Sequence, residues 1–211
     1  MVAGFGFGFV ELLLLLSGGL PPHNLPPLPE DARLVSSAPD ECLLYVSWYG
    51  TAEAKADSAN QTEQLMAEPE VRSFLKNLWS SVKTSVERQT GREAPLFSQF
   101  VFPLVEAASQ RPTAIFLKKV EGVPFQPVVQ AGAVVNVGDY KQQVAPLLMQ
   151  LEQMMLAELP GELDEVEVKG VKVRYLPLPE GVQVGWGFYE DYLLIAVGGG
   201  TAVESVGKLT T

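Results

Sequence analysis

The sequence has few of the residues from which metal centres and disulfide frameworks are built. It contains one cysteine and one histidine in 211 residues, which excludes a disulfide framework and a conventional Cys/His metal site. The histidine, His23, lies in a proline-rich stretch, so no Ser-His-Asp triad can form in the folded body. The cysteine, Cys42, precedes an apolar run and is interpreted as a buried structural thiol.

Positive charge is also scarce. Lys and Arg number 15 against 25 Asp and Glu, for a formal net charge of -10. A phosphate backbone must be met by clustered cations, so this balance argues against nucleic acid and against anionic membrane surfaces as partners. The chain is 47% hydrophobic and 19% charged, which is enough apolar material for a sizeable core and excludes global disorder.

The first thirty residues predict export. Residues 1–20 resemble a signal peptide, because the apolar run Leu12–Leu16 precedes Ser17-Gly18-Gly19. Glu11 lies inside the apolar core and no Lys or Arg precedes it, so a membrane anchor or a misassigned reading frame stay open as alternatives. Residues 21–30 form a tether, since five prolines in the nine positions from 21 to 29 favour an extended backbone.

The remainder, residues 31–211, is expected to be a single α+β domain with a mostly antiparallel sheet and long amphipathic helices packed on one face. A strand at Cys42–Trp48 is predicted to be buried on both faces or nearly so. The expected helices are Pro69 to Gly91, about Leu96 to Gln110 with a bend at Pro103, Asp139 to about Leu159, and Ala202–Leu209. The other expected strands are 113–120, 128–137, two that form a hairpin around Lys169-Gly170, 182–188 and 192–197. The final helix suggests a domain truncated at its C-terminus.

Three groups of residues are candidate sites. Gly198-Gly199-Gly200-Thr201 opens a helix and could bind phosphate, but no Lys follows the glycines, so a turn with Thr201 as the N-cap is favoured. An acidic stretch could hold Ca²⁺, but its spacing matches no calcium loop and a solvated charged turn is favoured. Exposed aromatic residues could stack on sugars or peptides, but core packing is favoured. The acidic stretch is Glu158, Glu162, Asp164, Glu165 and Glu167, and the aromatic cluster is Trp186, Phe188, Tyr189 and Tyr192.

No catalytic, cofactor-binding or metal-binding residue is assigned, and no cofactor is expected. The nucleophile elbow GxSxG, the HExxH motif and the GxxxxGK[ST] phosphate loop are absent from the sequence. The methionines of the helix after Asp139 could line a groove for an amphipathic partner, but core packing is again the favoured interpretation.

Several segments of the sequence resemble exported bacterial domains of unknown function. They are residues 31–35, 38–40 and 44–47, the helix start at 64–75, the hairpin at 168–173 and the strand at 192–198. The resemblance covers residues 31–211. It implies an extracytoplasmic domain that is often followed by a second related half, and it carries no catalytic residue.

Together these observations predict a non-enzymatic exported or cell-surface domain that acts through protein interaction or assembly, with an unknown protein partner at the cell envelope. Two alternatives stay open. One is a hydrolase with paired carboxylates, completed by a missing C-terminal half, and the other is a periplasmic module that binds a small ligand. Carboxylates that converge in a concave site would favour the hydrolase, and an open sheet would favour interaction.

Overall fold

The computed structural model describes residues 28–91, 97–123, 126–158, 163–177, 182–198 and 200–210. The segment at 1–20 and the tether up to residue 27 lie outside the described residues. Within the span 31–211 that the sequence predicted as one α+β domain, the chain forms parts of two compact units. Residues 50–110 belong to one unit, and residues 29–49 and 111–211 form the other. The first unit is thus inserted after the first strand of the second.

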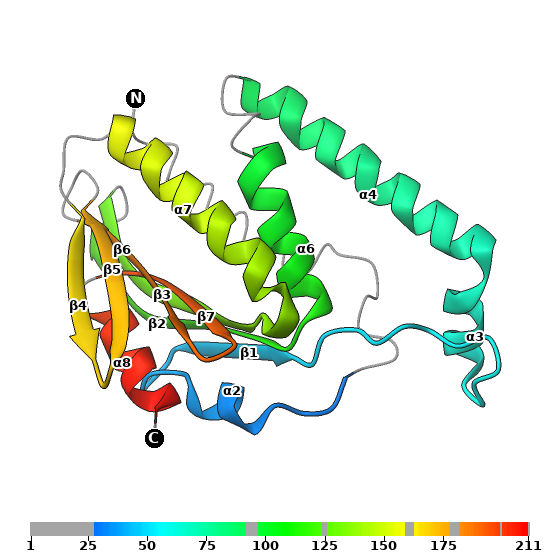
Figure 1. Ribbon diagram of the computed structural model, residues 1–211, viewed down its shortest axis with the longest axis horizontal. Coiled ribbons are helices and arrows are strands. Elements are labelled where there is room, and N and C mark those ends of the chain that lie inside the picture. The colour runs from blue at the N-terminus through cyan, green and yellow to red at the C-terminus, as the bar shows by residue number, and fades with distance from the viewer. Residues whose placement is uncertain are drawn as a thin grey trace. The chain divides into compact units, whose positions relative to one another are not determined.

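The inserted unit is helical. Its described helices are α3 (Gln61–Ala67), α4 (Pro69–Thr90) and α6 (Phe102–Gln110), with a π-helical turn at Phe97–Val101 (Figure 1). Asn60 caps α3 through its side-chain oxygen. Pro69 starts α4 and Gly91, at φ 55°, ends it, which confirms the predicted helix and both of its boundary signals.

Helices α4 and α6 are joined by one mixed cluster. The rings of Trp79 and Phe102 meet edge to face, with centroids 6.0 Å apart. The indole N–H of Trp79 donates to the Glu106 carboxylate, which also pairs with Lys83. The π-helical turn ends just before Pro103 and marks the place where a bend was predicted.

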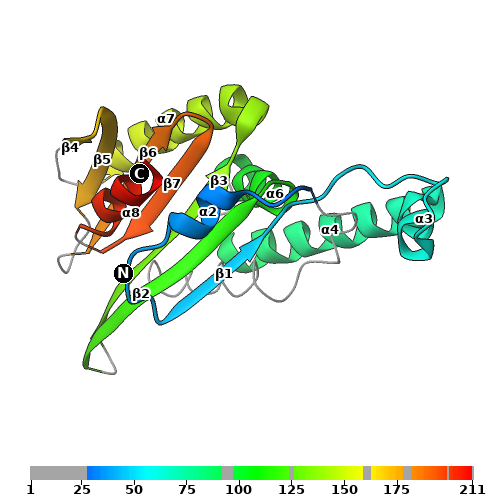
Figure 2. The ribbon, with the colours of Figure 1, turned by 90° about the horizontal axis from the view of Figure 1, so that it is seen from below.

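The second unit is built on a seven-stranded sheet in which every neighbouring pair is antiparallel. The spatial order is β1-β2-β3-β7-β6-β5-β4 (Figure 2). The strands are β1 (Leu44–Trp48), β2 (Thr113–Val123), β3 (Gln126–Asn136), β4 (Asp164–Val168), β5 (Val171–Pro177), β6 (Gln183–Tyr189) and β7 (Tyr192–Val197). The predicted α+β class and antiparallel sheet are therefore confirmed.

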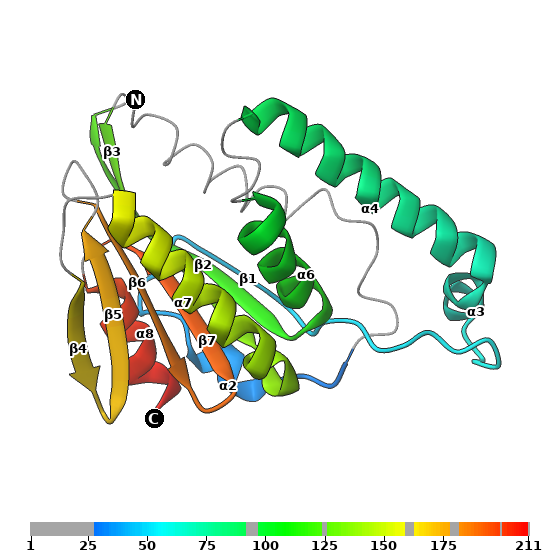
Figure 3. The same cartoon turned by 45° about the horizontal axis from the view of Figure 1, so that its top comes forward.

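Helices lie on both faces of this sheet, whereas the sequence predicted one face. Helix α7 (Lys141–Glu158) covers one face, and the short helices α2 (Ala32–Ser36) and α8 (Thr201–Leu209) cover the other (Figure 3). The alternation of side chains along β5 shows the same division. Arg174 reaches Glu152 of α7 at 2.8 Å, while its neighbours Val173 and Tyr175 pack in a core cluster with Val206 of α8.

The core on the α2/α8 face depends on two glycines that leave room for aromatic rings. A Cβ on Gly132 would lie 2.5 Å from Cζ of Phe116, and one on Gly185 would lie 2.7 Å from Cε1 of Tyr175. Both rings are buried, and Ala202 of α8 also lies against Gly185. The glycines in β3 and β6 thus set how closely the aromatic side chains approach the sheet.

The predicted strand at Cys42–Trp48 begins later and is not buried on both faces. Strand β1 starts at Leu44 and forms an edge of the sheet, with Leu44 54% and Val46 38% exposed. An uninterrupted apolar run is typical of a central strand. Here the run lies at the margin, so the expected burial is wrong.

The helix expected from Asp139 differs at its start. Asp139 lies within a 3-10 turn at Gly138–Tyr140, and α7 begins at Lys141. Pro146 lies inside the helix. Met149 is exposed, whereas Val144 and Leu148 are buried, so the buried face of α7 is aliphatic at this point.

Candidate functional site

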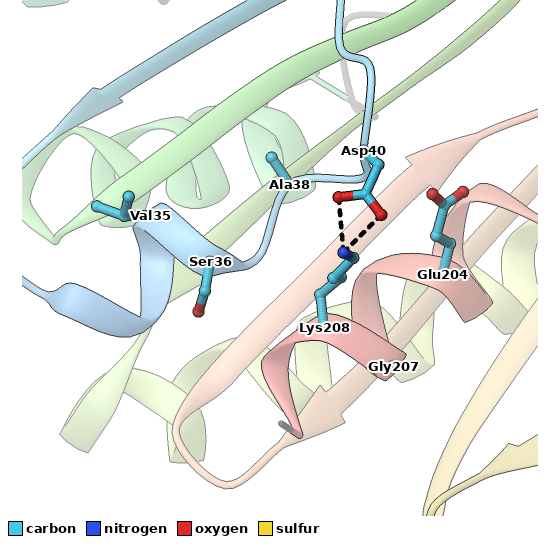
Figure 4. Close-up of a pocket in the computed structure, with 7 residues that line it drawn as sticks. All are labelled: Val35, Ser36, Ala38, Asp40, Glu204, Gly207 and Lys208. Carbon is cyan, nitrogen blue, oxygen red and sulfur yellow. Dashed lines mark hydrogen bonds and ion pairs between the residues drawn. The ribbon is translucent and has the colours of Figure 1, made fainter.

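A hollow of about 700 Å³ lies between α2, the following loop and α8. Its lining includes Val35 and Ala38 from the α2 side, with Glu204, Gly207 and Lys208 from α8. Figure 4 shows Asp40 pointing toward Lys208, with Glu204 one turn before Lys208 in α8. The hollow therefore places two carboxylates beside α8, one from the loop after α2 and one from α8 itself.

Each carboxylate of the hollow has an ammonium partner. Asp40 accepts from the Lys208 ammonium at 2.7 Å with both oxygens, and Glu204 pairs with Lys118 of β2. The Asp40 side chain is 78% exposed. The two carboxylates of the hollow are therefore held in separate ion pairs.

Among the described side chains of the acidic stretch, which leave out Glu158 and Glu162, the structure shows no group that could hold Ca²⁺. Glu165 pairs with Lys172 at 2.7 Å and with Arg174 at 3.5 Å, and the hydrogen bond from Lys172 lowers the pKa of Glu165. Asp164 points to the opposite face of β4, because side chains alternate along a strand. Glu162 lies outside the described residues. In the described part of the chain, no three Asp, Glu, His or Cys side chains are placed to hold a metal ion.

The glycine-rich turn before α8 is only partly described, because Gly199 lies outside the described residues. Gly198 and Gly200 adopt φ values of 97° and 75°, which favour glycine. The N-cap of α8 is Gly200 and not Thr201 as predicted; Thr201 is the first helical residue and is buried. A Cβ on Gly198 would approach the Val129 carbonyl oxygen to 2.9 Å. Close packing against β3 thus accounts for this glycine.

The aromatic cluster belongs to the sheet core. Trp186 and Tyr192 are buried, and Phe188 and Tyr189 are half-buried. The ammonium of Lys141 lies 5.5 Å from the centroid of the Phe188 ring. The interpretation as core, in place of a stacking surface for sugars or peptides, is confirmed for the two buried rings.

Cys42 lies just before β1 and is half-buried. Its thiol donates to the Pro39 carbonyl at 3.0 Å, and burial raises its pKa. A raised pKa reduces the thiolate fraction at neutral pH. The residue therefore has the properties of a structural thiol, although it is less buried than predicted.

A partly buried hydrogen-bond network around Asp31 was not predicted from the sequence. The Asp31 carboxylate caps α2 by accepting from the Arg33 N–H at 3.1 Å. It also accepts from the Asn136 side-chain amide at 2.7 Å and from the Tyr192 hydroxyl at 2.9 Å. Burial and the hydrogen bond to Asp31 raise the pKa of Tyr192 to about 12. The network fastens the start of this unit to β3 and β7, which lie far along the chain.

The outward side of strand β1, Leu44–Trp48, is the second candidate surface, and we call it the β1 edge. The Asn136 N–H donates to the Pro112 carbonyl at 2.9 Å, so from residue 112 to residue 117, before the register shift, even-numbered residues bond to β3 and odd-numbered ones bond to β1. The register pairs those odd-numbered residues with even-numbered residues of β1. The N–H and C=O groups of Tyr45 and Ser47 therefore point away from the sheet.

The side chains of the β1 edge are uncharged and partly open. No charged residue occurs from position 42 to position 52, and Leu43, Leu44 and Val46 are exposed. Tyr45 lies on the other face, where its hydroxyl donates to the Leu34 carbonyl at 3.0 Å. Exposed edge strands are usually protected by charges, proline or a bulge. The β1 edge has no charged or proline residue.

Strand β4, at the opposite edge of the sheet, does carry such protection. Asp164, Glu165 and Glu167 supply three acidic side chains over five residues, and Val166 between them is 43% exposed. Because like charges on a strand oppose pairing with a further acidic strand, β4 is a poor template for association. The two edges of the sheet thus differ in charge, and charge on an edge strand controls whether a further strand can pair with it.

No family model, curated protein or solved structure matches the chain. Among the helices in the described ranges, none combines the length and the apolar character needed to cross a membrane.

Proposed function

We propose that the chain is a non-enzymatic protein-interaction domain that works outside the cytoplasm and assembles through the β1 edge. The observation that carries the proposal is the unprotected edge strand: the Tyr45 and Ser47 backbone groups point outward, and Leu44 and Val46 are exposed beside them. Such an edge offers main-chain hydrogen bonds for affinity and apolar side chains for specificity. Burying it in an assembly also removes an aggregation hazard.

The hydrolase alternative has less support from the geometry. In the described hollow, Asp40 pairs with Lys208 and Glu204 pairs with Lys118. Both carboxylates are already engaged in ion pairs, whereas acid–base hydrolysis needs a carboxyl pair placed about a substrate. We therefore rank interaction above hydrolysis.

The ligand-binding alternative makes a different prediction for the same hollow. Its volume lies in the range of small-molecule sites, but one wall is an ion pair whose Asp40 side chain is 78% exposed. A binding module would show a raised Tm with some member of a panel of sugars, peptides and divalent cations. A domain that assembles through the β1 edge should show no such rise.

Export is supported by the first thirty residues of the sequence and by the resemblance to exported bacterial domains, which stays a prediction. Deleting residues 2–20 should retain the protein in the cytoplasm, whereas the full chain should be recovered from the envelope or the medium. Cell fractionation with a C-terminal tag measures the difference. A full chain that stays in the cytoplasm with its first twenty residues intact would contradict the proposal.

The interaction itself is tested by the size of the native complex in the source cells. The tagged full chain should migrate on a native gel above its own mass of 22.9 kDa. Val46→Lys should shift it to the position of the free chain, because an ammonium at the β1 edge opposes burial. Val166→Lys makes the same change on β4, at a residue of similar exposure, and should leave the complex intact.

Substitutions in the hollow separate the competing functions. The double substitution Asp40→Asn with Glu204→Gln removes both carboxylates and should leave the native complex unchanged. A complex that survives Val46→Lys, or that is lost only when the hollow is altered, would refute assembly through the β1 edge.

A further inference from the structure

We infer that the occupant of the β1 edge is a second copy of this chain, joined so that two seven-stranded sheets become one continuous antiparallel sheet. The inference rests on the proposed function and makes it specific. It follows from three observations: the outward direction of backbone groups of β1, the pattern of its side chains about a central residue, and the charge of the rest of the molecule.

The backbone groups fix the register of such a pair. Two antiparallel copies of β1 related by a twofold axis at Val46 place Tyr45 opposite Ser47 of the second copy, and the reverse. These are the two residues whose N–H and C=O groups point away from β2. Each Tyr45–Ser47 pair would exchange both hydrogen bonds, and Val46 would face its own copy in a non-hydrogen-bonded pair.

The side chains match in that register. On one face Val46 meets Val46 of the second copy, and Leu44 meets Trp48 at either end of the strand. Aromatic and β-branched pairs of this kind stabilise antiparallel strands. On the other face Tyr45 meets Ser47. The sequence Leu-Tyr-Val-Ser-Trp is therefore self-complementary about its central valine. Apolar side chains meet apolar side chains, and the outward N–H and C=O groups of each copy meet those of the other.

The distribution of charge favours pairing through the β1 edge over pairing through β4. Each copy carries a formal net charge of -10, so two copies repel except where they meet through an uncharged surface. The β1 edge lies in a stretch without charge from position 42 to position 52. Pairing through β4 would bring Asp164, Glu165 and Glu167 of two copies together, and like charges in facing strands are destabilising.

The first test measures the mass of the purified full chain by sedimentation velocity over a range of concentrations. The wild type should approach twice the mass of one chain as concentration rises. Val46→Lys places two ammonium groups opposite each other on the axis and should raise the dissociation constant by at least about tenfold. Val166→Lys should leave it unchanged. A wild type that remains monomeric at every concentration would overturn the inference.

The second test uses disulfide formation and does not depend on weakening the pair. In a Cys42→Ser background, Val46→Cys should oxidise to a covalent dimer, because non-hydrogen-bonded partners lie about 4.5 Å apart at Cα, within disulfide range. Ser47→Cys, one residue further along, should not, since the two copies of residue 47 are offset along the strands and directed to the other face. Val166→Cys should also stay reduced. Efficient cross-linking of Ser47→Cys without Val46→Cys would refute the register.

The two levels of the proposal fail separately. If the purified chain is monomeric and Val46→Cys does not cross-link, while the cellular complex is still lost in Val46→Lys, then the β1 edge binds a different protein and only the second copy is refuted. If Val46→Lys changes neither the purified chain nor the cellular complex, both the inference and the proposed function are wrong.

Discussion

Replacing Asp31 by alanine should destabilise the unit that contains the sheet, because one carboxylate serves three donors. The substitution removes the α2 cap, a loss of about 1 kcal/mol. It also leaves the Tyr192 hydroxyl, in a side chain only 7% exposed, without its acceptor, at a cost of about 1–3 kcal/mol. The Asn136 amide is half-buried and can turn toward water, so it adds little. We expect a total loss of about 2–4 kcal/mol.

The assay is urea unfolding at pH 7 followed by circular dichroism, with two companion variants. Asp31→Asn keeps a capping oxygen and an acceptor for Tyr192, so it should lose less than Asp31→Ala. Tyr192→Phe removes the hydroxyl donor that Asp31→Ala leaves without an acceptor. The double variant should therefore be less destabilised than the sum of the single variants, by about 1–2 kcal/mol.

Two outcomes would refute this reasoning. A loss below about 1 kcal/mol for Asp31→Ala would mean that water replaces the carboxylate without penalty, contrary to the cost expected for a buried unpaired hydroxyl. Additive single and double variants would mean that the contact between Asp31 and Tyr192 contributes nothing beyond the separate residues.

Two further predictions concern the sheet core. The pKa of Tyr192 is raised from 10.0 to about 12 by burial and by Asp31, so the stability due to the neutral hydroxyl is complete below pH 10 and is lost as pH rises toward 12. The loss is at most about 3 kcal/mol, and about 1–2 kcal/mol after solvent screening. Urea unfolding measured against pH should show a smaller decline in Tyr192→Phe, and parallel profiles of the two proteins would contradict the prediction. Gly132→Ala places a Cβ 2.5 Å from the buried Phe116 ring and should lower the free energy of unfolding by about 1–3 kcal/mol. Gly207→Ala in α8 meets nothing within 4 Å and should raise it by about 0.5–1 kcal/mol; equal effects of the two alanines would refute this account.

Features with a local cause were predictable from the sequence. Lys169 and Gly170 both adopt positive φ, 49° and 81°, as the expected tight turn between two alternating strands requires. Pro69 and Gly91 bound α4 as predicted. In each case a few consecutive residues determine the backbone without help from the rest of the chain.

The position of β1 in the sheet was not predictable in this way. The strand pairs with β2, which begins at Thr113 after the inserted helical unit, and strand order is a property of the whole topology. An apolar run such as Leu44–Trp48 fits a central strand and an edge that is covered by another chain equally well. The sequence pattern alone therefore could not distinguish the two positions.

The network around Asp31 is non-local for the same reason. Asp31 and Tyr192 lie 161 positions apart, and neither residue type in its own context indicates the other. The Asp before a short apolar segment is a helix N-cap signal, which would have identified α2 and one of the three contacts. The contacts with Asn136 and Tyr192 depend on how β3 and β7 lie beside the start of the unit.

Amide hydrogen exchange at the β1 edge tests the central claim most directly. The N–H groups of Tyr45 and Ser47 point away from β2, so in the dissociated chain they should exchange rapidly. In the assembled state, measured on the same full chain at high concentration or in the complex isolated from cells, both should become protected, and Val46→Lys should abolish that protection. If both amides exchange equally fast with and without assembly, the β1 edge is not the surface through which this protein associates.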